Sequence, residues 1–174
     1  DNWELAGALT DGQFENIFEN NYQYIVTDNK AMVVYYDSST TPKYRIWENT
    51  PGAWGGQGVA TALSGNLEWV VLKQARTRNE VALGTIDATG DIRVQFWNGT
   101  TWTATKLLGN LGTTWDNLRS FDMEYENGND RLVVVYASGV GNVTPKYSVW
   151  DGDSWVIDNQ AVSTTSPAPT TGWV

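Results

Sequence analysis

The chain has 174 residues, among them 10 Trp, 8 Tyr, 4 Phe and 17 Gly, and only 18% are charged, a composition that favours sheets and turns over helices. A net charge of -9 argues against nucleic acid and anionic membranes as partners, because such binding depends on Lys and Arg neutralising phosphates. The absence of His and Cys excludes imidazole bases, thiol nucleophiles, disulfides and the usual zinc ligands.

In chain order, residues 1–20 match no repeat, and we expect them to form an N-terminal cap or a strand lent to a neighbouring unit. Three blade-like units are expected at 21–62, 63–113 and 114–165, and the start of a further unit at 166–174. An alternating segment, expected to be the first strand, opens each unit, at 22–26, 69–72 and 121–125. A β-branched run, the expected second strand, follows at 31–36, 81–86 and 131–136.

The third strand of each unit shows the clearest repeat. The segment Thr-Pro-Lys-Tyr-Arg-Ile-Trp at 41–47 returns as Thr-Pro-Lys-Tyr-Ser-Val-Trp at 144–150. A variant, Asp-Ile-Arg-Val-Gln-Phe-Trp, lies between them at 91–97. Because self-similarity at a fixed period is the mark of repeat architectures, the three copies place the units in one common frame.

A second Trp follows each third strand, at Trp54, Trp102 and Trp155. The residues between the two Trp include Asn98-Gly99 and Asp151-Gly152, which predict tight hairpins because Gly tolerates a positive φ. A fourth strand should therefore return antiparallel to the third.

These patterns predict an all-β chain of tandem four-stranded antiparallel units of about 50 residues, β-propeller-like and incomplete within this chain. A unit of that size cannot cover its own apolar faces, so stacked neighbours must do so. We expect the chain to be a segment of a longer array, rather than one that closes a ring with other copies or stacks in an open form.

The motif Trp-Asp-Gly-x-x-Trp at 150–155, and its variant Trp-Asn-Gly-x-x-Trp at 97–102, resembles the repeats of bacterial and archaeal surface proteins with propeller-type repeats. It is more distantly similar to fucose-binding lectins whose two-blade subunits form propellers, and faintly to the Asp-box turn of sialidases. Such lectins carry a Glu three residues before the first Trp. Here those positions hold Tyr44, Val94 and Tyr147, so that sugar site is not carried over.

Strand alternation places each Trp on the same strand face as the polar residues of the third strand. A Trp beside an Arg could stack on a sugar ring while the guanidinium binds hydroxyls or a carboxylate. The candidate residues are Arg45, Trp47, Arg93, Trp97 and Trp150. The competing interpretation, which we favour, is that these Trp fill the wedge between neighbouring units.

Two pairs of carboxylates, Asp87 with Asp91 and Asp151 with Asp153, offer hard oxygen ligands close in sequence and are candidate ligands for calcium, the only candidate cofactor. Neither pair makes the full calcium-loop pattern, and solvated turn carboxylates are the favoured account. Asn98 and Asn142 begin the only two N-x-Thr triplets considered as glycosylation sites.

The sequence therefore predicts a protein without catalytic activity, a structural or assembly module of an extracellular or cell-surface protein such as a surface layer, filament or adhesin. Its expected partners are copies of itself or neighbouring repeats, with glycans as a further class, and no membrane insertion is expected. A carbohydrate-binding propeller is the alternative. A glycosidase is a remote one, because the available carboxylates Glu68, Asp122, Glu124 and Glu126 show no distinctive spacing.

Overall fold

The computed structural model describes residues 14–16, 30–48, 51–114, 119–141 and 144–162. These residues contain strands, turns and loops and no helix. Consequently, none of the described residues belongs to a helix long and apolar enough to cross a membrane. The expected all-β fold is confirmed.

The strands form three antiparallel sheets, each ordered as the strands follow one another in the chain. Sheet I contains β1 (Phe14–Asn16), β2 (Lys30–Tyr35), β3 (Lys43–Glu48) and β4 (Ala53–Trp54), and β5 (Gly58–Val59) also pairs with β3. Sheet II contains β6 (Leu67–Gln74), β7 (Val81–Asp87), β8 (Asp91–Trp97) and β9 (Lys106–Asn110). Sheet III contains β10 (Phe121–Tyr125), β11 (Leu132–Tyr136), β12 (Lys146–Trp150) and β13 (Trp155–Ala161).

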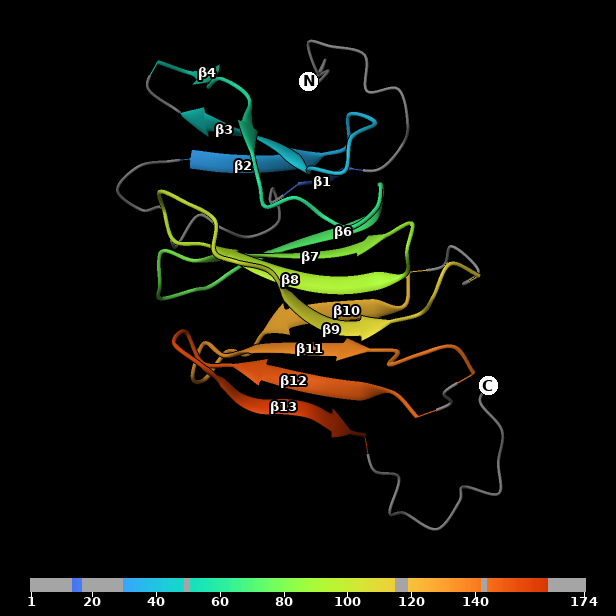
Figure 1. Cartoon of the computed structure of the whole chain (residues 1–174). Coiled ribbons are helices and arrows are strands. Elements are labelled where there is room, and N and C mark those ends of the chain that lie inside the picture. The colour runs from blue at the N-terminus through green and yellow to red at the C-terminus, as the bar shows by residue number, and fades with distance from the viewer. Residues whose placement is uncertain (1–13, 17–29, 49–50, 115–118, 142–143, 163–174) are drawn as a thin grey trace, which may run out of the picture.

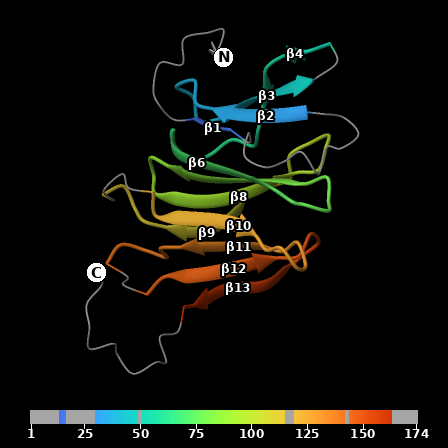
Figure 2. The ribbon, with the colours of Figure 1, turned by 180° about the vertical axis from the view of Figure 1, so that it is seen from behind.

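The three sheets are stacked with sheet II in the middle, as both ribbon views show (Figure 1, Figure 2). Sheets II and III fall within the units expected at 63–113 and 114–165. Consecutive first strands lie near one another, β1 beside β6 and β6 beside β10. This is the arrangement of neighbouring propeller blades, in which the first strands lie innermost.

The first strand of sheet I differs from the expectation. The segment 22–26, expected to be this strand, lies outside the described residues, as do the rest of 1–20 and all of 166–174. Instead, β1 lies inside the segment expected to be a cap or lent strand, and it pairs with β2 of the same chain from Phe14↔Tyr35 to Asn16↔Val33. Three residues are too short to show an alternation, so only pairing reveals this strand.

The interface between sheets I and II is a continuous apolar cluster. Met32 and Val34 of β2 pack against side chains of sheet II, namely Leu67, Val70, Leu72, Val81, Leu83 and Trp97. Gln95, 1% exposed, is satisfied here because it accepts a hydrogen bond from the Thr61 backbone N–H at 2.9 Å. Each large apolar side chain buried in this way contributes about 1.5–3 kcal/mol to stability.

The interface between sheets II and III is built in the same way. Phe121, Met123 and Tyr125 of β10 and Leu132, Val134 and Tyr136 of β11 pack against the other face of sheet II. Phe121 lies directly over Gly84, where a Cβ would come within 2.6 Å of its ring. Every residue of β7 is buried because sheet II is covered on both faces.

Candidate functional site

The Trp-Asn/Asp-Gly-x-x-Trp motif forms the hairpin between the third and fourth strands of sheets II and III. The Asn98 Oδ1 accepts hydrogen bonds from the backbone N–H groups of Thr100 and Thr101, both at 3.0 Å. Asp151 Oδ1 does the same for Asp153 and Ser154, at 3.0 and 2.8 Å. The Asn or Asp side chain of the motif therefore stabilises the turn by accepting hydrogen bonds from the turn's own backbone N–H groups.

Two features favour Gly in the motif, a positive φ and the close approach of a neighbouring side chain. Gly99 and Gly152 have φ of 99° and 105°, a region that L side chains rarely adopt. A Cβ on Gly99 would also lie 2.2 Å from Asn79, and one on Gly152 would lie 2.6 Å from Arg78 Nε. The motif is thus explained by backbone geometry and close packing.

The Trp residues of the motif pack between sheets. Trp97 and Trp102 contact one another at 5.6 Å between ring centroids, and Tyr44 of sheet I lies 5.3 Å from Trp97. One sheet further on, Trp150 stacks on Phe96 of sheet II at 4.5 Å. Two of the candidate stacking residues, Trp97 and Trp150, therefore lie in the wedge between neighbouring sheets, the arrangement that we favoured from the sequence.

Trp47, the third candidate, makes the same cross-strand pair with Trp54, at 5.6 Å between centroids. It shares one face of β3 with Arg45, and the alternate residues, Tyr44 and Ile46, pack toward sheet II. Trp47 and Arg45 therefore lie on the face of sheet I that is turned away from sheet II, and both are half-buried.

Arg93 is engaged by its own sheet. Its Nη2 donates to Asp91 Oδ2 at 2.6 Å and to the Ser64 hydroxyl at 2.9 Å. Asp91 also accepts from the Asn110 amide. Burial alone would raise the pKa of Asp91, but the hydrogen bonds from Asn110, Arg93 and Ser64 outweigh it and lower the pKa. The Arg93 guanidinium is thus bound to a carboxylate and a hydroxyl.

Asp87 is fully buried and stabilises the turn after β7 through hydrogen bonds. One carboxylate oxygen accepts from the backbone N–H groups of Ser64 and Gly65, at 3.1 and 3.2 Å. The other accepts from the Thr89 N–H and hydroxyl, at 2.9 and 2.5 Å. The carboxylate oxygens considered for calcium are therefore occupied by N–H and O–H donors in this structure.

Asp151, the other calcium candidate, is held by its backbone contacts, and hydrogen bonds from Ser154 and Asp153 lower its pKa. Asp153 is exposed beside it. Across the described ranges, no group of three or more acidic side chains is placed to share a metal ion. Asn98 is exposed in its turn, and Asn142 lies outside the described residues.

A buried polar network between sheets II and III was not recognised from the sequence. Glu80, 9% exposed, accepts from Tyr125 Oη and Arg78 Nη2, both at 2.8 Å, and from Trp150 Nε1 at 3.1 Å. Tyr125 and Trp150 come from sheet III, while Glu80 and Arg78 belong to the β6–β7 hairpin of sheet II. Burial, followed by the charge of Glu80, raises the pKa of Tyr125.

Asp130 completes this network from the β10–β11 hairpin. It accepts from the backbone N–H groups of Arg76 and Thr77, at 2.7 and 2.9 Å, and from the Thr77 hydroxyl at 2.7 Å. Burial opposes ionisation, but these hydrogen bonds and the nearby Arg78 charge outweigh it and lower the pKa of Asp130. The residues lie far apart in the chain, and the only local signal was a cluster of charges at a hairpin.

A small hollow of about 190 Å³ lies at the rim of the interface between sheets I and II. Tyr44, Trp97 and Trp102 line it together with Thr100 and Thr101. The Nε1 of Trp102 is buried and has no hydrogen-bond partner in the described structure. Aromatic rings and threonine side chains thus meet at this rim.

No protein-family model matches this chain, and no curated protein matches it in sequence. In a search of solved structures it resembles the NanB sialidase of Streptococcus pneumoniae in complex with 2-[(3-chlorobenzyl)ammonio]ethanesulfonate, with a TM-score of 0.52 and 13% identity. A structure of the same sialidase with Optactamide also gives a TM-score of 0.52 and 13% identity.

The match covers 77% of this chain and 22% of the first sialidase chain, and 74% and 21% for the second. The chain therefore spans about a fifth of the sialidase that it resembles. At this level of identity the likeness shows the fold alone, and it supports a propeller-like fold for this chain.

Proposed function

We propose that this chain is a structural, non-catalytic module of an extracellular or cell-surface repeat protein, in which four-stranded sheets stack to build a larger assembly. The observation that carries the proposal is that the repeated Trp residues form the contacts between neighbouring sheets. Trp97, Trp102, Trp150 and Trp155 pack against Tyr44 or Phe96 of the preceding sheet. The extracellular placement rests on the sequence resemblance to surface repeat proteins.

The state of the carboxylates supports the non-catalytic part of the proposal. Glu124 pairs with Lys73 at 2.8 Å and Asp122 with Arg119 at 2.9 Å, and Glu126 pairs with Arg131. Hydrogen bonding to Arg131 lowers the pKa of Glu126, whereas a glycosidase acid needs a raised pKa. Three of the four carboxylates that the sequence offers for glycoside hydrolysis therefore take part in ion pairs within the chain.

Light scattering coupled to small-angle X-ray scattering, together with a glycan array, tests this function. A structural module should give assemblies larger than one chain at high protein concentration and no saturable glycan binding. A protein that stays monomeric and binds one glycan class saturably would overturn the proposal.

Glycan binding is the second candidate, supported by the hollow that Tyr44, Trp97 and Trp102 line. A sugar ring would stack on an aromatic side chain here. The Trp102→Ala variant removes one of these rings, so it should weaken glycan binding about 10-fold. Trp155→Ala, at the corresponding place in sheet III, is the matched control. Equal affinities for both variants in calorimetric titration would exclude this site.

A further inference from the structure

The way each sheet meets the next follows one rule in this structure. In every sheet a Trp at the end of the third strand lies opposite the start of the second strand: Trp47↔Ala31, Trp97↔Val81 and Trp150↔Leu132. A second Trp lies beside it, giving the pairs Trp47–Trp54, Trp97–Trp102 and Trp150–Trp155. The Trp pairs of sheets II and III both pack on an aromatic ring of the preceding sheet.

The receiving faces of the three sheets can be aligned by the same register, but the ring that meets the next Trp pair is Tyr44 in sheet I and Phe96, two positions further along the strand, in sheet II. Toward sheet II, sheet I presents Val34 with its cross-strand partner Tyr44. At the corresponding register, sheet II presents Gly84 with Val94, and sheet III presents Val135 with Tyr147. No sheet among the described residues covers this face of sheet III, and Val135 is 42% exposed.

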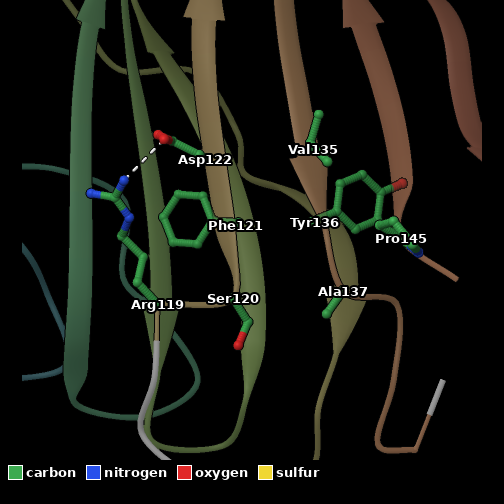
Figure 3. Close-up of a pocket in the computed structure, with 8 residues that line it drawn as sticks. All are labelled: Arg119, Ser120, Phe121, Asp122, Val135, Tyr136, Ala137 and Pro145. Carbon is green, nitrogen blue, oxygen red and sulfur yellow. Dashed lines mark hydrogen bonds and ion pairs between the residues drawn. The ribbon is translucent and has the colours of Figure 1, made fainter. Parts of the chain in front are cut away.

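A hollow of about 520 Å³ lies at one end of this uncovered face. Asp122 and Val135, which are cross-strand partners, line it together with Arg119 and Pro145 (Figure 3). At the interface between sheets II and III, the corresponding Gly84 is covered by the Phe121 ring of the next sheet. The hollow is therefore placed where the first strand of another sheet would cover Val135.

The opposite end of the stack carries the complementary half. Sheet I turns its Trp47–Trp54 pair away from sheet II, on the face that also holds Arg45 and Lys43. The receiving face of sheet III holds Asp122 and Glu124, which pair with Arg119 and Lys73 of the same chain. The two end faces thus repeat the two halves of the interfaces inside the stack: sheet I ends in a Trp pair, and sheet III ends in a receiving face that no described sheet covers.

We infer that two copies of this chain associate head to tail, with the Trp47–Trp54 face of one copy on the Val135–Tyr147 face of sheet III of the next. The inference rests on the proposed assembly function and identifies the contact between copies, which we call the joint: the Trp47–Trp54 face against the Val135–Tyr147 face. Such a contact is heterologous, so it leaves a free face of each kind and propagates into a ring or an open filament.

Sedimentation velocity on the full chain across a wide concentration range tests this joint. Wild type should grow with concentration, whereas Trp47→Ala, which removes the plug, and Val135→Arg, which blocks the receiving face, should each stay monomeric. An equimolar mixture of the two variants retains one intact joint, so it should form discrete dimers that contain one chain of each. Leu107→Arg, at an equally exposed apolar position on β9 of the middle sheet, should assemble like wild type.

Circular dichroism and thermal unfolding show whether each variant folds, and Arg45→Glu replaces Trp47→Ala if the latter does not. Growth of all variants like wild type would overturn the joint while leaving the assembly function standing. Loss of assembly in Val135→Arg alone would indicate a contact between two copies of sheet III, contrary to the head-to-tail arrangement. A wild type that is monomeric at every concentration would remove both the joint and the proposed function.

Discussion

Trp150 and Glu80 meet across the interface between sheets II and III, where the indole Nε1 donates a hydrogen bond to the Glu80 carboxylate at 3.1 Å. The other carboxylate oxygen accepts from Tyr125 and Arg78. One side chain of sheet II therefore satisfies two buried donors of sheet III. Because an unpaired buried donor costs stability, this carboxylate couples the two sheets energetically.

Glu80→Leu should lower the free energy of unfolding by about 2–3 kcal/mol, because it leaves the donors Tyr125 Oη, Trp150 Nε1 and Arg78 Nη2 without their acceptor. Urea unfolding followed by Trp fluorescence measures the loss. Glu126→Gln, which removes a half-buried ion pair within the β10–β11 hairpin, is the control and should lower the midpoint much less. Equal midpoints for the two variants would show that the network does not couple the sheets.

Gly84→Val should destabilise the protein by about 1–3 kcal/mol, because the new side chain would overlap the Phe121 ring and force sheets II and III apart. Thermal unfolding measures the effect. Gly128→Ala is the matched control, since a Cβ there meets no atom within 4 Å. A Gly84 variant as stable as the Gly128 variant would contradict the close contact between the sheets.

Gly152→Ala should cost about 1–3 kcal/mol, because the residue has a positive φ and its Cβ would press on the Arg78 guanidinium. The effect should appear both in the midpoint of chemical unfolding and in faster amide exchange of the hairpin between β12 and β13. Gly139→Ala, where the nearest atom lies 3.8 Å from the new Cβ, provides the comparison. Unchanged exchange at the hairpin would disprove the packing role of this Gly.

Protonation of Asp130 should lower the stability of the protein in acid. Its folded pKa lies below the ordinary value of 3.8, so the unfolded state binds the proton more readily. The stabilisation is complete above about pH 4 and is lost as the pH falls through the folded pKa. Asp130→Asn, which tolerates the left-handed φ of 57° at this position, should be less stable than wild type at neutral pH.

Urea midpoints of wild type and Asp130→Asn, compared between pH 6 and strongly acidic solution, check this expectation. The gap between the two proteins should narrow as the pH drops below about 4. A constant gap over the whole range would mean that the ionised carboxylate contributes nothing beyond its shape.

Local chemistry in the sequence was sufficient to predict the first three strands of sheets II and III, the hairpins after their third strands and the face of each third-strand residue. Alternation over five residues identifies β10, whose burial changes at every residue, because side chains on a strand point to opposite faces with a period of two. Gly99 and Gly152 marked their turns because few other residues adopt a positive φ. The repeated Trp occupies the same register in all three sheets, since each repeat of a structure repeats its core residues.

Contacts between residues distant in the chain were decided only by the tertiary structure. β1 is too short for a pattern and is recognised only by its pairing with β2. In the sequence, nothing distinguishes Glu80 from other charged residues in hairpins. Its hydrogen-bond partners Tyr125 and Trp150 come from sheet III and are known only from the structure. Trp97 is a second example. Strand alternation placed it on the same face as polar residues of β8, but in the structure Tyr44 of sheet I packs on it. Sequence alone could not show this contact, because the residues that cover one face of a sheet come from the neighbouring sheet.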